Sequence, residues 1–237
     1  MSGGAEISVD GADGVRFVTL DRSQKRNALS ADILEVFTDA IVGARSAGFG
    51  IVCLRSASPT IFCAGADVGE LRGGAATLDR LMRSLASLLQ ALDEAEPLIV
   101  TLLQRRALGA GGVVVGLSDI VLASESASIE FPEIRMGLYP AFVHAALADR
   151  LHRTKLFQLC ATGQPVLPDE ALHYGLFTEI LPEEDFDSSA EDRLAWYQRN
   201  MDSLLFGREL RRSKRQETVG ERLAAVTDAF RKHVNAS

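Results

Sequence analysis

Apolar and polar residues alternate near the start of the chain and then change to helical spacing. From Ile7 to Leu20 the alternation predicts two strands joined by a turn at 10–14, which is rich in Asp and Gly. Ser30 offers a helix N-cap, and apolar residues recur at helical spacing from Ile33 to Ala44. The pattern therefore predicts a β-hairpin followed by an amphipathic helix.

The middle of the chain alternates between short apolar runs and helical stretches. We expect buried strands at 51–55, 98–103 and 120–123, and one long amphipathic helix with an apolar stripe from Leu78 to Leu92. We interpret this stripe as core packing and not as a cofactor site. Because strands and helices alternate along the chain, the predicted fold class is α/β.

The pattern becomes helical after about residue 140. Helices are expected at 145–151, 156–160 and 168–174, and an acidic linker that begins at 181–185 precedes two further helices. We divide the chain into a core at 1–182 and a C-terminal helical region at 183–237.

Two loops of small residues follow apolar runs at probable turns into helices. One is Ala107–Leu117, which contains Gly109, Ala110, Gly111 and Gly112, and the other is Phe62–Asp67. A glycine turn that opens a helix leaves backbone N–H groups without intrahelical partners, and the helix dipole adds positive potential there. Either loop alone also suits a tight turn for helix packing, but two such loops can direct N–H groups at one oxygen.

Composition narrows the class of protein. A chain of 237 residues with 47% hydrophobic content and a net charge of −7 indicates a soluble globular protein and disfavours nucleic-acid binding. No apolar run reaches the ~18 residues of a membrane span, and the first residues lack a signal-peptide pattern, so we expect no membrane contact and a cytoplasmic location.

The cysteines and histidines do not predict a metal site. Cys53, Cys63 and Cys160 are scattered, which favours reduced core thiols over disulfides, with a nucleophilic Cys63 as the alternative. The four histidines have no metal-ligand spacing with one another or with cysteine. We therefore expect no metal ion.

Four motifs in order resemble the enoyl-CoA hydratase/isomerase family, also called the crotonase superfamily. They are the opening segment 25–30, the loop 62–67, the loop 107–117 and the segment 131–138, and the resemblance covers roughly the first three quarters of the chain. The resemblance implies a spiral of strand-strand-helix turns that binds an acyl-CoA thioester. It also implies a homotrimer or a dimer of trimers, with 183–237 as a trimerisation and CoA-capping region.

The resemblance assigns the catalytic groups by position. The backbone N–H groups of Ala66 and Ala110 correspond to the pair that holds the thioester oxygen, although Gly111 is an alternative to Ala110. Hydratases of the family use two carboxylates, and here the first position is Val113 and the second is Glu133. One base favours moving a double bond over adding water, so isomerisation is expected, with hydration and non-catalytic acyl-CoA binding as the alternatives.

The resemblance also places the CoA moiety. Its adenine is expected near Ala28 and Ala64, its phosphates beside Lys25 and Arg26, and Asp67 is included among the CoA-binding residues. A late basic run either contacts the CoA phosphates or is a solvated helix face. This run consists of Arg208, Arg211, Arg212, Lys214 and Arg215. Apolar neighbours are expected to raise the pKa of Glu133 towards neutrality.

Overall fold

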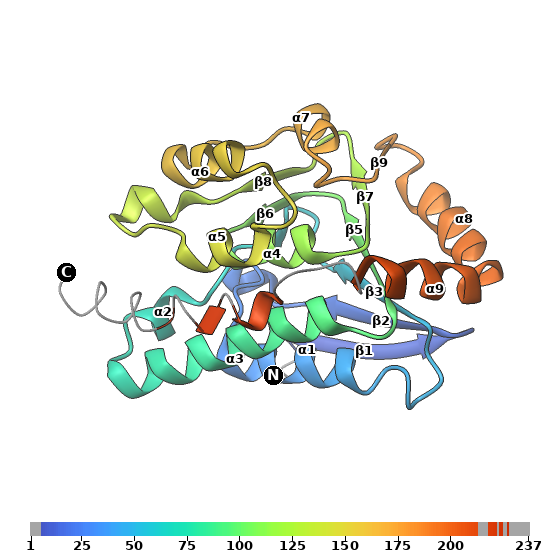
Figure 1. The fold of residues 1–237 in the computed structure, drawn as a ribbon, viewed down its shortest axis with the longest axis horizontal. Helices are drawn as coiled ribbons and strands as arrows, with labels where there is room; N and C mark the ends of the chain where they lie inside the picture. The colour runs from blue at the N-terminus through green and yellow to red at the C-terminus, as the bar shows by residue number, and fades with distance from the viewer. Residues whose placement is uncertain (1–5, 213–217, 222, 225–226, 228–237) are drawn as a thin grey trace.

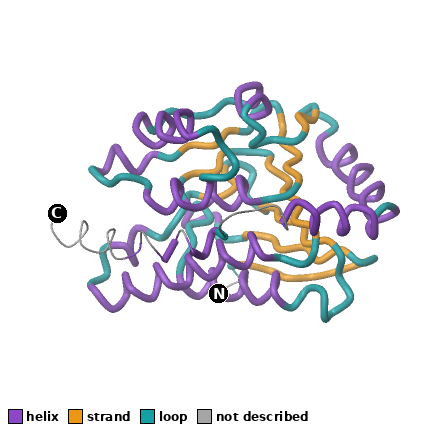
Figure 2. Tube along the Cα trace, viewed as in Figure 1, coloured by secondary structure: helices purple, strands orange, loops and turns teal. Residues whose placement is uncertain are grey.

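The computed structural model describes residues 6–212, 218–221, 223–224 and 227. Helices lie on either side of its strands, and the strands at one edge extend beyond them (Figure 2). The strands are β1 (Ile7–Ala12), β2 (Val15–Leu20), β3 (Ile51–Ser56), β4 (Ile61–Cys63), β5 (Leu98–Leu103), β6 (Arg106–Leu108), β7 (Ile120–Ser124), β8 (Ser128–Glu130) and β9 (Glu179–Leu181). The predicted hairpin and the three predicted buried strands are present.

The helices follow the expected order with shifted boundaries. They are α1 (Ala31–Val42), α2 (Val68–Leu71), α3 (Ala75–Glu94), α4 (Ala110–Leu117), α5 (Ala141–Leu147), α6 (Arg153–Thr162), α7 (Pro168–His173), α8 (Phe186–Arg199) and α9 (Met201–Arg212), with short 3₁₀ helices η1 (Ser23–Lys25) and η2 (Pro132–Met136). The Ser30 hydroxyl accepts a hydrogen bond from the Ile33 N–H, as the predicted N-cap requires. No helix in this described part of the chain is both long and apolar enough to span a membrane.

The strands form two sheets that the chain visits alternately. The larger sheet has the order β1-β2-β3-β5-β7-β9, and the smaller one, β4-β6-β8, is parallel throughout. Only β1 and β2 pair antiparallel in the larger sheet. The chain thus passes from the large sheet to the small sheet and then to a helix, three times in succession. These are the strand-strand-helix turns that the resemblance implies.

Helices cover both faces of the larger sheet. In β3, Val52 and Leu54 face a core shared with α1, α3, α4 and α5, whereas Ile51 and Cys53 face a second core closed by α8. A strand buried on both faces is apolar at successive positions, which explains its continuous hydrophobic run. In Figure 1, α1 and α3 lie side by side along one side of the strands, and α8 and α9 lie at one end.

The short strands β4, β6, β8 and β9 are additions to the sequence-based prediction. Each has three residues, too few for alternation to appear in the sequence. Positions 62–63 and 107–108, which we expected to be loop, therefore belong to β4 and β6. The first helix after Pro140 spans Ala141–Leu147, so the expected 145–151 was placed too late.

Helix α9 is attached to the core by a buried ion pair, which corrects the interpretation of Arg208. Its Nε lies 2.6 Å from the Asp119 carboxylate, and both side chains are 4% exposed. The guanidinium also donates to the backbone oxygens of Leu92 and Ala95. Arg208 is therefore neither solvated nor directed at a phosphate. The side chains of Arg211, Arg212, Lys214 and Arg215 lie outside the described part of the chain.

Candidate active site

The two loops of small residues lie against each other. Gly65 has φ +89° and Gly109 has φ +50°, a left-handed backbone that favours glycine. A Cβ atom on Gly65 would stand 2.9 Å from the Leu108 carbonyl oxygen and 3.4 Å from the Ala110 nitrogen. The close approach of the loops therefore depends on the absence of a side chain at position 65.

Two backbone N–H groups at this contact have no acceptor among the described residues. Leu29 exchanges hydrogen bonds with Gly65 and Asp67, which leaves the intervening Ala66 N–H pointing away from that bridge. Ala110 is the first residue of α4, so its N–H has no intrahelical partner. Both residues line one pocket. The alternative donor, Gly111, does not line this pocket, and a Cβ at that position would stand 2.8 Å from the Cys63 sulfur.

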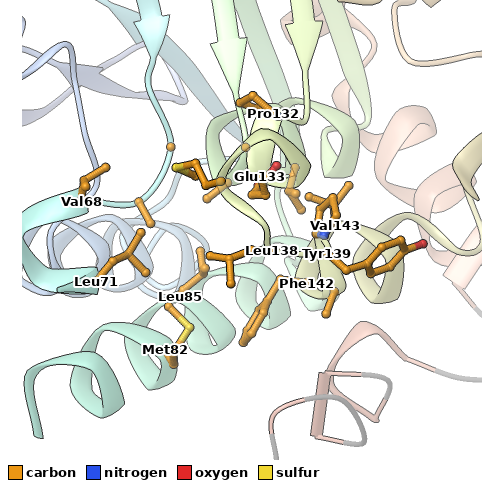
Figure 3. Close-up of a pocket in the computed structure, with 18 of the residues that line it drawn as sticks. Val68, Leu71, Met82, Leu85, Pro132, Glu133, Leu138, Tyr139, Phe142 and Val143 are labelled. Atoms are coloured by element: carbon orange, nitrogen blue, oxygen red, sulfur yellow. The ribbon is translucent and has the colours of Figure 1, made fainter. Parts of the chain in front are cut away.

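The pocket beside these loops is almost entirely apolar (Figure 3). Its lining comes from the two loops, α2, α3, α4, η2 and α5, and it includes Val68, Leu71, Met82, Leu85, Leu89, Val113, Met136, Leu138, Phe142 and Val143. Glu133 is its only carboxylate among the described residues. The α3 stripe packs in the core as we interpreted it, and three of its residues, Met82, Leu85 and Leu89, also line the pocket.

Glu133 is held at the start of η2 with one oxygen unpaired. Its Oε2 is buried without a hydrogen-bond partner in the described structure. Its Oε1 lies so close to Gly109 that a Cβ there would stand 2.8 Å away. Burial raises the pKa of the Glu133 carboxyl from 4.5 to about 7, as its apolar neighbours predict. At neutral pH this carboxyl can both accept and return a proton.

Glu130 has a different environment, although it is only three residues away. Its carboxylate is 3% exposed and lies 2.8 Å from Arg106 and 2.5 Å from Arg135. Both oxygens are thus paired with arginines. The neighbouring Arg105 donates to the Pro59 carbonyl oxygen and to the Ser126 hydroxyl. These contacts hold strands and loops together. They give Arg105 and Arg106, which precede the loop 107–117, a structural role.

The first motif lies beside the loop that contains Gly65. The Ala64 N–H donates to the Arg26 carbonyl oxygen at 3.0 Å, so these backbones are adjacent. Lys25 and Arg26 have exposed side chains, whereas Ala28 and Ala64 are partly buried. The expected CoA-binding segments are therefore neighbours in space.

Asp67 already has two partners in this region. Its carboxylate lies 2.7 Å from the Arg22 guanidinium and accepts from the Gly69 N–H at 2.8 Å, which caps α2. Burial acts to raise the pKa of this carboxyl, but the hydrogen bonds from Arg22 and Gly69 outweigh it and lower the pKa. Asp67 therefore orders the loop, and any contact with CoA remains a prediction.

Asn27 organises the same loops, and the sequence analysis missed this. Its buried amide donates to the Ser56 hydroxyl and the Phe62 carbonyl oxygen, and its Oδ1 accepts from the Arg22 N–H. Asn tolerates positive φ, here +53°, better than most residues do. The signal in the sequence that could have identified Asn27 is an amide residue within the motif 25–30, next to the exposed Lys25 and Arg26.

The three cysteines are core residues. All are buried and unpaired, and burial raises the pKa of each thiol to about 12. A thiol with that pKa is not a nucleophile at neutral pH, which excludes the alternative role for Cys63. The described residues contain no group of three His, Cys, Asp or Glu side chains placed to hold a metal ion.

The chain is similar in sequence to known proteins. Residues 10–233 match the family described as enoyl-CoA hydratase/isomerase. The chain is 28% identical over 181 residues to enoyl-CoA hydratase domain-containing protein 3, mitochondrial, of Rattus norvegicus, which covers 75% of this chain and 60% of that protein. It is 30% identical over 181 residues to 2,3-dehydroadipyl-CoA hydratase of Escherichia coli K12, covering 75% and 70%.

A solved structure shows the same fold. The enoyl-CoA hydratase of Mycobacterium avium subsp. paratuberculosis K-10 superposes with a TM-score of 0.88 at 21% identity, covering 100% of this chain and 96% of that one. The match to the rat protein spans only about three fifths of that relative's length. The family match over residues 10–233 establishes that the chain belongs to the enoyl-CoA hydratase/isomerase family.

Proposed function

We propose that this protein moves the double bond of an enoyl-CoA thioester, with Glu133 as its acid–base group. The observation that carries the proposal is the unpaired, buried Oε2 of Glu133 beside two backbone N–H groups without acceptors. The family supports an acyl-CoA substrate. No separate cofactor takes part in this chemistry, because coenzyme A is part of the substrate.

The thioester oxygen binds between the N–H groups of Ala66 and Ala110. Ionised Glu133 removes a proton from C2 of a 3-enoyl-CoA, and the electron pair delocalises onto the thioester oxygen. Donors placed where this negative charge develops typically lower the barrier by roughly 3 kcal/mol each. The protonated Glu133 then returns the proton at C4, and the double bond moves to C2–C3. A carboxyl with a pKa of about 7 suits both steps.

Hydration is the alternative reaction, and the relatives named hydratases favour it. Adding water across a double bond is best served by two groups that hold and activate the water. In this pocket Val113 occupies the side wall where the family places the first carboxylate, and no second carboxylate is present in the described lining. This lining favours isomerisation.

The remaining parts of the proposal concern the CoA moiety and assembly. Exposed Lys25 and Arg26 would meet the CoA phosphates, with Ala28 and Ala64 beside the adenine. We also propose a homotrimer or a dimer of trimers, with residues 183–237 as the assembling and CoA-capping region, in the cytoplasm. Sedimentation of the purified protein would test the assembly.

A product assay with 2-enoyl-CoA and 3-enoyl-CoA substrates tests the reaction. Isomerisation predicts conversion of the 3-enoyl thioester to the 2-enoyl thioester, with little 3-hydroxyacyl product. A hydroxyacyl product formed at a comparable rate would favour hydration. No turnover of either thioester, with binding intact, would favour a non-catalytic acyl-CoA binder.

The variant Glu133→Gln tests the base. General-base catalysis is worth ~10²–10⁴ in rate, so kcat should fall by that order while acyl-CoA affinity changes little. Glu184→Gln is the matched control, because Glu184 is exposed and lies outside the pocket. Loss of binding together with turnover would make Glu133 structural, and an unchanged rate would place the base elsewhere.

A further inference from the structure

The end of the pocket remote from Glu133 is built from large apolar side chains. In Figure 3, Met82 of α3 and Phe142 of α5 lie on the side opposite Glu133, with Leu85 and Leu138 between. Met82, Leu85 and Phe142 are buried in the structure, at 3%, 4% and 7% exposure. An acyl chain that places its thioester at the two loops would direct its far end towards these side chains.

No positive charge lines this space among the described residues. Glu133 and Tyr139 are the only titratable groups in the described lining. The Tyr139 hydroxyl is 2.7 Å from Nδ1 of His144, a residue outside that lining, and is already engaged. The remaining contacts available to an acyl chain come from aliphatic or aromatic carbon, methionine sulfur and backbone. A neutral hydrocarbon chain is stabilised there by burial.

A negatively charged chain end meets the opposite situation. Moving a carboxylate from water into an apolar space without a partner is costly. The only other charge in the described lining, that of ionised Glu133, is also negative and adds repulsion. The pocket therefore discriminates by charge at the chain end, and this discrimination can be measured by binding alone, without turnover.

Building on the proposed function, we infer that Met82, Leu85 and Phe142 select uncharged acyl chains and exclude chains that end in a carboxylate. The substrate class is thus a thioester with an aliphatic acyl chain. A 2,3-dehydroadipyl thioester, whose chain ends in a second carboxylate, is outside it.

Binding of saturated thioesters tests this inference without any turnover. Hexanoyl-CoA, adipoyl-CoA and the monomethyl ester of adipoyl-CoA are compared by calorimetry on the wild-type protein. Adipoyl-CoA should bind at least roughly 100-fold more weakly than the neutral methyl ester. The inference is overturned if adipoyl-CoA binds as tightly as the ester, or if the ester is excluded as strongly as the acid, because size would then decide.

A charge added to the distal wall should reverse the preference. Met82→Lys replaces one long, flexible side chain with another that carries an ammonium group, and Met82→Gln is the neutral polar control. The lysine variant should improve the affinity for adipoyl-CoA relative to hexanoyl-CoA by roughly 10-fold or more, and the glutamine variant should not. An equal change in both variants would contradict the inference. If the lysine variant does not fold, the wild-type comparison still decides.

These experiments separate the inference from the proposed function. Failure of the protein to turn over any enoyl-CoA would contradict the function and leave the binding preference measurable. Turnover of 2,3-dehydroadipyl-CoA at the rate of hex-2-enoyl-CoA would contradict the inference and leave the function intact.

Discussion

Replacing Glu133 with glutamine should stabilise the folded protein at high pH. Folding raises the pKa of this carboxyl from 4.5 to about 7, so the folded state binds its proton more tightly than the unfolded state does. The stability contributed by that protonated carboxyl is fully present below pH 4.5 and is lost as the pH rises through 7. At about 1.4 kcal/mol for each pKa unit, the loss by pH 8.5 is about 3 kcal/mol.

Urea unfolding at pH 5 and pH 8.5 measures this effect. The difference in unfolding free energy between Glu133→Gln and wild type should increase by about 2.5 kcal/mol in favour of the variant between these pH values, because the unfolded carboxyl is already largely ionised at pH 5. For a chain of this length the corresponding gain in Tm is roughly 5–10 °C. Glu184→Gln controls for the loss of one charge. A free-energy difference that is the same at both pH values would refute the reasoning, because burial would then not oppose ionisation of Glu133.

Three further changes test other parts of the site and the core. Gly109→Ala should reduce turnover at least roughly 10-fold, because its Cβ would stand 2.8 Å from Glu133 Oε1 and its φ is positive; unchanged kcat would contradict this. Val113→Glu should raise hydration of 2-enoyl-CoA above the wild-type level, measured as 3-hydroxyacyl product. No gain in a folded variant would mean that Val113 does not face the substrate. Arg208→Ala should cost about 3–5 kcal/mol in urea unfolding because it removes the guanidinium partner of the buried Asp119 carboxylate, whereas Arg193→Ala, at an exposed pair, should cost under about 1 kcal/mol.

The parts of the site that depend on local backbone chemistry could be predicted from the sequence. Gly65 and Gly109 have the positive φ values that glycine-rich turns favour, and Glu133 has the raised pKa that its apolar neighbours predict. The relevant physics in each case acts within a few residues. The composition of the two loops indicated that they could direct N–H groups at one oxygen, whereas their contact distances came only from the structure.

The features that sequence analysis missed depend on residues far apart in the chain. Met82 belongs to a stripe with ordinary helical spacing, and nothing in that spacing separates pocket wall from core. Arg208 belongs to a basic run, but its partner Asp119 is 89 positions away. A buried ion pair and a solvated charge have the same local sequence pattern. Only the tertiary fold distinguishes them.

The small parallel sheet has a consequence for how this site can change. Ala66 follows β4, Ala110 follows β6 and Glu133 follows β8, so each contribution comes after its own strand at one end of the sheet. Backbone pairing fixes the strands whatever side chains follow them. A substitution after β8 can therefore exchange the acid–base group while the N–H groups after β4 and β6 keep their positions. In the proposed mechanism, selection or design could therefore change the proton-transfer group after β8 without moving the N–H groups that would hold the thioester oxygen.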